Sequence, residues 1–157
     1  MALSPADMKA AYPLPVYNYT VEIDGEVIAF AEVSGLDIVF DTITYKESKT
    51  DQPGSGPNVM HMPGQGTPVN VSLNKGYVLT KNMPVFYDWI NSIKLNVVQK
   101  KDIVVRLLDE QGDAVVSWTV INAFPTKLTA PSFNADSNEV AIESLDVMAS
   151  ALTMGED

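Results

Sequence analysis

The chain carries few side chains that could perform covalent, acid–base or metal chemistry. Its 157 residues include one histidine and no cysteine, which excludes disulfides, thiolate metal sites and cysteine nucleophiles. A Ser-His-Asp triad or a histidine metal site would have to rest on His61 alone, and no carboxylate lies at a recognised ligand spacing from it. We therefore expect no catalytic residue, no metal site and no cofactor, and we predict that the chain is not an enzyme.

Pairs of carboxylates along the chain have spacings that do not suit hydrolysis. A glycosidase needs two carboxyl groups about 5 to 10 Å apart. Asp37 and Asp41, like Glu139 and Glu143, are four residues apart, which is about 13 Å along an extended strand. The acidic turn at residues 109–113 lacks the alternating ligands of a calcium loop. These groups therefore offer no obvious place for acid–base or metal chemistry.

The overall charge is strongly acidic. The chain has 20 acidic and 10 basic side chains, a formal net charge of −10, and Arg106 as its single arginine. A protein that binds duplex nucleic acid needs lysines and arginines to displace counterions from phosphates, so we expect no stable nucleic-acid binding. No apolar run reaches the roughly 18 residues that span a membrane, so we expect no membrane insertion. Residues 1–15 lack the pattern of a secretory signal, which predicts synthesis and folding in the cytoplasm.

Alternating polar and apolar residues predict strands along most of the chain. Residues 17–24 have the period of a half-buried strand, and Asp24-Gly25 favours a tight turn into a second strand. The faces of residues 36–46 are mixed, which suits a strand that touches protein on both sides. The phase of the apolar residues changes after Ile142, which predicts a bulge near Glu143 or Ser144. Strands are predicted at residues 17–24, 27–33, 36–46, 67–75, 103–108 and 114–121 and around residues 140–147.

One segment has the period of a helix that packs on a sheet. Asn82 could cap this helix, and Pro84 is tolerated in its first turn. The predicted packing residues lie at i, i+3, i+4 and i+7 and are Phe86, Trp89, Ile90 and Ile93. A single helix beside about seven strands predicts a mainly β fold, an antiparallel β-sandwich or barrel.

Residues 46–66 are predicted to form a long loop within a single domain that spans residues 1–157. The segment is rich in Lys, Ser, Asp, Pro and Gly and has no apolar period. Loops of this length usually carry function or stay disordered until something binds them. The first 15 residues form an amino-terminal arm with little local pattern, and we expect the arm to order only against a neighbouring subunit.

Several short motifs occur in a fixed order along almost the whole chain. They are YPLP at 12–15, VEIDG at 21–25, EVSGLD at 32–37, MPGQ at 62–65, WINSI at 89–93, KKDI at 100–103, NAFPT at 122–126, APSF at 130–133 and NEVAIE at 138–143. Together they resemble the tail tube, or inner tube, proteins of contractile injection systems. The resemblance is strongest to extracellular systems of the antifeeding-prophage and Photorhabdus virulence cassette type, and contractile phage tail tubes are related.

The resemblance implies a structural role. Members of this family have the phage tail tube fold, and a hexameric ring closes around a continuous inner β-barrel. Stacked rings form a hollow conduit that is driven by sheath contraction and delivers cargo through its lumen. The implied partners are copies of the chain, a contractile sheath protein, baseplate or tube-initiator and terminator proteins, and a tape-measure protein and protein cargo in the lumen. The implied location is an injection particle, extracellular after release or associated with the cytoplasm or membrane, or a virion tail.

The resemblance also implies roles for particular residues. The long loop would contact the adjacent ring, and Asn74 stands where the family often carries arginine. The implied inter-ring contacts are Thr50, Asp51, Asn58, Val59, Met60, His61 and Met62. The candidates for lining an acidic, polar lumen are Asp41, Thr42, Thr44, Asn70, Ser72, Asn74, Glu139 and Glu143. Two alternatives remain open, the tail tube of a contractile bacteriophage that conducts DNA and a monomeric β-sandwich binding module.

Overall fold

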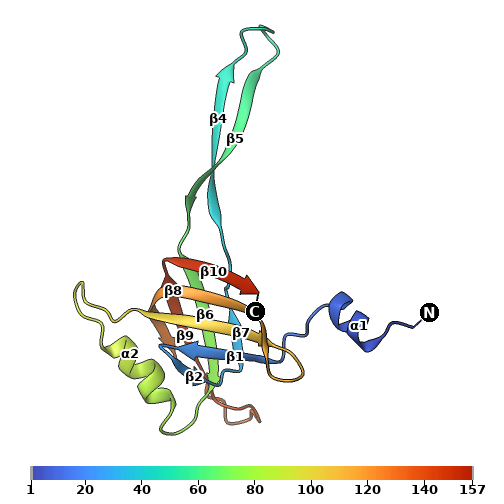
Figure 1. Cartoon of the computed structure of the whole chain (residues 1–157). Helices are drawn as coiled ribbons and strands as arrows, with labels where there is room; N and C mark the ends of the chain where they lie inside the picture. Colours follow the sequence, from blue (N-terminus) through green and yellow to red (C-terminus); the bar gives the residue numbers. More distant parts are fainter. Residues whose placement is uncertain (1, 157) are drawn as a thin grey trace.

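The computed structural model describes residues 2–156, which form ten strands and three short helical segments (Figure 1). The mainly β, antiparallel fold predicted from the sequence is confirmed. The helical segments are α1 (Pro5–Ala11), the π-helical turn η1 (Met83–Tyr87) and α2 (Asp88–Asn91). The strands are β1 (Tyr19–Ile23), β2 (Glu26–Ile28), β3 (Glu32–Ser34), β4 (Phe40–Ser48), β5 (Pro57–Gly66), β6 (Val69–Gly76), β7 (Lys101–Leu108), β8 (Ala114–Thr129), β9 (Ile142–Ala149) and β10 (Ala151–Glu156).

Eight strands form one hydrogen-bonded sheet that folds into two layers. Their order is β2-β1-β7-β8-β9-β6-β3, and β10 also pairs with β8. The long strand β8 belongs to both layers, since its first part pairs with β7 and β10 and residues 124–129 pair with β9. We call β2, β1, β7, β10 and the first part of β8 the first layer. The second layer consists of residues 124–129 of β8 with β9, β6 and β3.

The core lies between the two layers and is built from alternate residues of each strand. In the second layer, Leu73 and Leu145 are fully buried. They pack in one apolar cluster with Ile103 and Val120 of the first layer. Each such side chain contributes roughly 1.5–3 kcal/mol of transfer free energy. The alternation that predicted the strands therefore also decides which face of each strand is buried.

The helical segment confirms part of the predicted packing and corrects the rest. Phe86 and Trp89 are buried, and Ile90 is half-buried, but Ile93 is 41% exposed. The prediction for Ile93 is wrong because α2 ends at Asn91, after which the chain turns. Asn82 does not cap the helix: its backbone is helical, and its side-chain oxygen accepts a hydrogen bond from the Val78 N–H at 3.0 Å.

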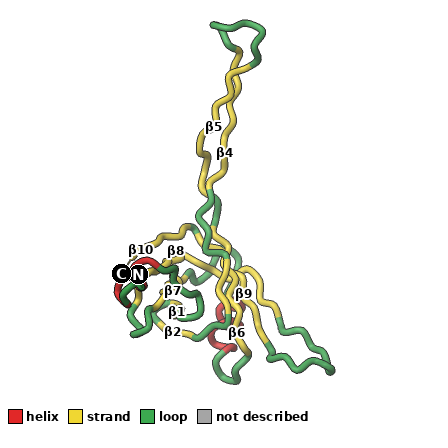
Figure 2. Tube along the Cα trace, turned by 90° about the vertical axis from the view of Figure 1, so that its right-hand side faces the viewer, coloured by secondary structure: helices red, strands yellow, loops and turns green. Residues whose placement is uncertain are grey.

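The segment predicted as a long loop is instead half of a long hairpin. β4 and β5 pair from Phe40↔Gly66 to Ser48↔Pro57 and stand away from the sandwich (Figures 1 and 2). The loop prediction for residues 46–66 is therefore wrong except for the turn at residues 49–56. The segment has no apolar period of its own, because its order comes from backbone hydrogen bonds to β4 and no core face selects its residues.

The amino-terminal arm contains a short helix, although its sequence was predicted to have little local structure. α1 begins after Ser4, whose hydroxyl accepts a hydrogen bond from the Asp7 N–H at 3.2 Å. The same hydroxyl donates to the Asp7 carboxylate at 2.6 Å. This Ser-Pro-x-Asp start is a recognisable capping pattern. The arm therefore contains a capped helix at residues 5–11, and its ordering against a neighbouring subunit stays a prediction.

Several strand predictions differ from the structure in detail. The strand predicted at residues 36–46 is β4, which begins at Phe40, and the strand predicted at residues 114–121 is β8, which continues to Thr129. Residues 27–33 were expected to form one strand, but β2 belongs to the first layer and β3 to the second. The bulge expected near Glu143 or Ser144 is absent from β9, which pairs with β6 in unbroken register. The irregularity lies in the partner strand, where the register with β9 shifts between Pro125 and Lys127. The change of phase in the sequence arises because a buried glutamate, Glu143, takes a core position.

Candidate functional site: polar face, hairpin and arm

The second layer turns one polar face away from the core. On β6, Asn70, Ser72 and Asn74 alternate with buried apolar residues, and all three lie on this face. The three residues predicted on this strand therefore share one surface. We call it the polar face. Its members in directly paired positions are Glu32, Ser34, Asn70, Ser72, Asn74, Phe124, Lys127, Thr129, Ser144, Asp146 and Met148.

A chain of side-chain hydrogen bonds crosses the polar face. The Ser144 hydroxyl donates to the Asn74 side-chain oxygen at 2.6 Å. The Asn74 amide donates in turn to the Glu32 carboxylate at 3.4 Å. Glu32, Ser144, Asp146 and Lys127 were missed by the sequence reasoning. The signal for Ser144 and Asp146 was their alternation with Leu145 and with the following valine.

The other residues proposed for the lumen lie elsewhere. Asp41, Thr42 and Thr44 are on β4 in the hairpin, where every residue of that strand is exposed. Glu139 is exposed in the connection between β8 and β9, and its N–H donates to the Ser137 hydroxyl at 3.2 Å. The predicted lumen set therefore divides between the polar face, the hairpin and one connecting segment.

Glu143 lies on the opposite side of the second layer from the polar face. It pairs with Lys75 of β6, and both side chains are buried, at 8% and 5% exposure. Within residues 2–156 the two side chains form no ion pair with each other, and the Lys75 ammonium donates to the Ala29 carbonyl at 3.1 Å. Burial raises the pKa of the Glu143 carboxyl. Its position separates Glu143 from the other lumen candidates.

The hairpin has one apolar and one more polar face. Ile43 pairs with Met62 and Tyr45 with Met60, so these four side chains share a face. Each of them is between 41% and 50% exposed. Nothing within residues 2–156 buries this stripe. We call these four residues the hairpin stripe.

The predicted inter-ring residues fall on two parts of the hairpin. Thr50 and Asp51 lie in the turn, whereas residues 58–62 belong to β5. His61 lies on the face opposite the hairpin stripe, where its Nδ1 is 3.1 Å from the Thr44 hydroxyl. Its partner is thus a hydroxyl, and residues 2–156 contain no group of three His, Cys, Asp or Glu side chains that could hold a metal ion.

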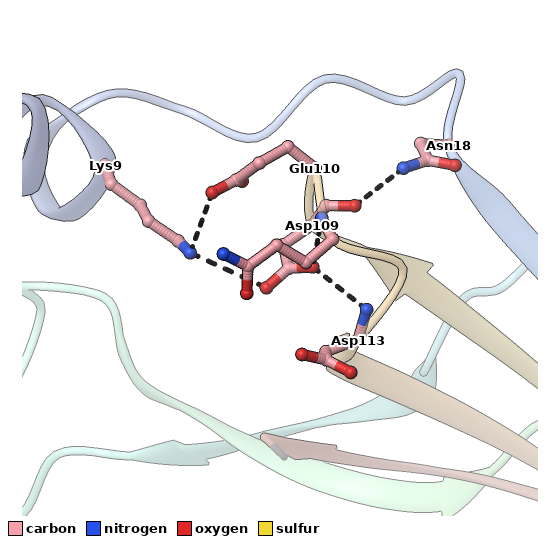
Figure 3. A network of polar contacts seen from close by, with 6 residues as sticks. Lys9, Asn18, Asp109, Glu110 and Asp113 are labelled. Atoms are coloured by element: carbon pink, nitrogen blue, oxygen red, sulfur yellow. Dashed lines mark hydrogen bonds and ion pairs between the residues drawn. The ribbon is translucent and has the colours of Figure 1, made fainter.

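The arm is attached to the body by a small polar network at the β7–β8 turn (Figure 3). The Lys9 ammonium lies 3.1 Å from the Glu110 carboxylate and 3.6 Å from that of Asp109. The Asn18 side-chain amide donates to the Asp109 carbonyl at 2.8 Å. An open groove of about 800 Å³ separates the arm from the sandwich, and its lining includes Met8 and Tyr12.

The same network shifts the ionisation of its members. Hydrogen bonds from the backbone N–H groups of Asp113 and Gln111 lower the pKa of Asp109. The backbone and the Lys9 ammonium lower the pKa of Glu110, and the Glu110 carboxylate raises the pKa of Lys9. Since the carboxyl pKa values are lowered by folding, first by the backbone of the turn and then by Lys9, these contacts stabilise the β7–β8 turn and the attachment of the arm at neutral pH. Their contribution is lost as the pH falls through the lowered values.

None of the helices formed by residues 2–156 is long and apolar enough to cross a membrane. The surfaces described above are the polar face, the apolar hairpin stripe and the arm held by its ion pairs to the β7–β8 turn. They are suited to contacts with other chains, because exposed apolar stripes and free strand sides are the features that bind partners.

Comparisons with known proteins agree with an assembly role. Residues 15–153 match the sequence profile of the family described as T4-like virus tail tube protein gp19. No curated protein matches the chain. A chain in the sheath–tube complex of the extracellular contractile injection system PVC, in the extended state, is 42% identical, with a TM-score of 0.88 over 99% of this chain and 100% of that one.

Two further solved structures are similar. A chain in the cap of the anti-feeding prophage, described as a tube terminating cap, is 44% identical, with a TM-score of 0.85 and full coverage of both chains. Hcp1 from Flavobacterium johnsoniae is 15% identical, with a TM-score of 0.52 over 90% of this chain and 97% of that one. The second similarity supports the fold alone.

Proposed function

The chain belongs to the T4-like virus tail tube protein gp19 family, and we propose that its copies close into hexameric rings that stack into the inner tube of an extracellular contractile injection system. The similarity at 42% and 44% identity to chains of the PVC and anti-feeding prophage particles supports this reading over a phage tail or a monomeric binding module. The tube would act as a passive conduit for cargo.

The second layer supplies the wall of the conduit in this proposal. Four strands from each of six copies would give a barrel of 24 strands. At about 4.8 Å between strands, the wall is roughly 115 Å around and 37 Å across before tilt, which widens it. The polar face would line the lumen, with Asn70, Ser72 and Asn74 from the predicted set. Its hydroxyls, amides and few charges would let cargo slide without binding tightly.

The hairpin supplies the contact between rings. Its stripe of Ile43, Tyr45, Met60 and Met62 needs a partner to be removed from water, and the hairpin extends well beyond the sandwich. An adjacent ring would cover that stripe, with Thr50 and Asp51 of the turn reaching furthest along the neighbour. The contact then buries apolar area that a single copy leaves exposed.

The particles that contain similar chains support a set of partners for the tube. The surroundings of those chains are described as sheath–tube, tube-terminating cap and baseplate structures. For this chain we propose a contractile sheath around the tube, a terminator and a baseplate at its ends, and a tape-measure protein and protein cargo inside. The particle would assemble in the cytoplasm of the producing cell and act after release.

The observation that carries the proposal is the agreement in fold and sequence over the full chain with two tube-containing particles. The test is light scattering after size exclusion, together with negative-stain microscopy, over a range of protein concentrations. We expect rings of six copies and stacked tubes. A monomer at every concentration, with no ring in the presence of the particle's own sheath and baseplate proteins, would contradict the proposal.

A further inference from the structure

The second layer ends in two strands that each have a free side. β3 is the last strand of the sheet order, and residues 124–129 of β8 lie at the other end of this layer. β7 lies on the side of β8 opposite β9 and pairs with β8 only as far as Lys101↔Ala123, so it leaves residues 124–129 uncovered on that side. Free backbone N–H and C=O groups of this kind readily pair with a strand from another chain.

The strand directions allow these two free sides to join each other. Every neighbouring pair in the layer is antiparallel, from β8 through β9 and β6 to β3. β8 and β3 therefore run in opposite directions. When β3 of one copy meets β8 of the next copy, the junction is a further antiparallel pair, and the alternation continues around the ring.

The register of the layer places opposite charges at the two free sides. Two rows of paired residues cross all four strands on the polar face. At one end Glu32 is exposed on β3, and at the other end Lys127 is exposed on β8. Within residues 2–156 Lys127 forms no ion pair. The first row consists of Glu32, Asn74, Ser144 and Thr129. The neighbouring row consists of Ser34, Ser72, Asp146 and Lys127.

We propose that Glu32 of one copy pairs with Lys127 of the next copy at every junction of the ring, and that this ion pair favours the registers in which the polar face stays continuous. The inference rests on the ring closure proposed above, and it adds which strands meet and which charges align them. Opposite charges across an interface favour the correct partner and disfavour wrong alignments.

The pair is compatible with the registers that keep the polar face continuous. In one register each row of one copy continues directly into the same row of the next copy. Glu32 and Lys127 then occupy diagonal positions across the junction, with Cβ atoms about 7–8 Å apart, within reach of a lysine side chain. In a second register the next copy is shifted by two residues so that its Lys127 is level with the row of Glu32. The two side chains are then directly opposite each other. A shift of one residue would turn the polar side chains of the neighbour to the wrong face.

The test is an exchange of the two charges. Glu32→Lys and Lys127→Glu each place like charges at every junction, so we expect the fraction of protein in rings to fall at least about tenfold at a fixed concentration. The double variant Glu32→Lys/Lys127→Glu restores opposite charges and should recover to within about twofold of the unmodified chain. Matched controls are Glu26→Lys and Lys94→Glu, which change the net charge equally at exposed positions away from the polar face.

The outcomes separate this inference from the proposed function. If the unmodified chain forms no rings, the proposed function fails. If it forms rings and the single variants assemble equally well, or if the double variant does not recover, the Glu32–Lys127 pair is wrong although the rings remain. Circular dichroism of each variant checks that the monomer is folded.

Engineered cysteines keep the inference testable if a charge variant does not fold. The chain has no cysteine, so each disulfide comes from the introduced pair. The two free sides are about 14 Å apart across three strand spacings, which prevents a disulfide within one copy. We expect Ser34→Cys/Lys127→Cys or Glu32→Cys/Lys127→Cys to give a ladder of cross-linked copies after oxidation, and Glu26→Cys/Lys127→Cys to give none. Absence of a ladder from both pairs in ring-forming protein would overturn the inference.

Discussion

The sandwich and the β4–β5 hairpin are both antiparallel β structure, but they are stabilised in different ways. In the sandwich, alternate residues of β6 and β9 are buried, down to 0% exposure at Leu73 and Leu145. In the hairpin, no residue of β4 or β5 is buried. The sandwich therefore has its own hydrophobic core, whereas the hairpin has backbone pairing and a stripe that is still exposed to water.

This difference indicates that the two regions gain their stability from different contacts. An isolated two-stranded hairpin is at best marginally stable in water. The hairpin is expected to gain its stability from contacts with another copy, whereas the sandwich folds without them. Substitutions in the sandwich should then change the free energy of unfolding, and substitutions in the hairpin should change assembly.

The largest loss of stability is expected in the core of the sandwich. Phe86 is fully buried and stacks on Phe30 with ring centroids 5.8 Å apart. Phe86→Ala should lower the free energy of unfolding by about 3–5 kcal/mol, because it leaves a cavity that the core cannot fill. Urea unfolding measures this loss. The control Leu95→Ala, at a position that is 90% exposed, should stay within about 0.5 kcal/mol.

Two glycines allow the cost of adding a side chain to be compared between the sandwich and the hairpin. Gly35 in the sandwich and Gly54 in the hairpin turn both have positive φ, at 89° and 85°. A Cβ at Gly35 would lie 2.1 Å from the Asn70 carbonyl oxygen, whereas a Cβ at Gly54 would meet nothing within 4 Å. Gly54→Ala should cost no more than about 1–2 kcal/mol and Gly35→Ala clearly more, because a clash adds to the dihedral strain. Equal losses in thermal unfolding would contradict this contrast.

A smaller effect, of opposite sign, is expected at Glu143. Burial raises its pKa above the ordinary value of 4.5, so the folded state favours the protonated carboxyl. Its contribution to stability is therefore present below that value and is lost as the pH rises through the raised pKa. Glu143→Gln should stabilise the chain at pH 7 and have little effect near pH 3. Unfolding curves at the two pH values test this, with Glu139→Gln as the exposed control.

The smallest effect on folding is expected in the hairpin. Tyr45 is 50% exposed, so Tyr45→Ala should change the free energy of unfolding of the monomer by less than about 0.5 kcal/mol. The same substitution removes part of the hairpin stripe, so tubes should form at a much higher protein concentration or not at all. Light scattering follows tube formation. If Tyr45→Ala strongly lowered the stability of the monomer but left tube formation normal, the contrast between the sandwich and the hairpin would be wrong.

Local patterns predicted much of the sandwich and less of the surfaces. The alternation around Val71 and Leu73 identified β6 and its polar face, because a buried strand face leaves a period of two in the sequence. Ser144 and Asp146 on β9 were missed although they show the same period. Glu32 and Lys127 at the free sides could not be identified from local pattern, since sheet order depends on contacts between distant segments.

The amino-acid sequence by itself determined the mainly β class, the absence of cysteine with a single histidine and, through its ordered motifs, the family resemblance. Only the tertiary structure decided that Pro57–Gly66 is a strand, that Glu143 faces the core and that β8 serves both layers. The reason is that local periodicity reports which side of a strand is buried, whereas the partner of a strand and the orientation of a whole face are fixed by hydrogen bonds between residues far apart along the chain.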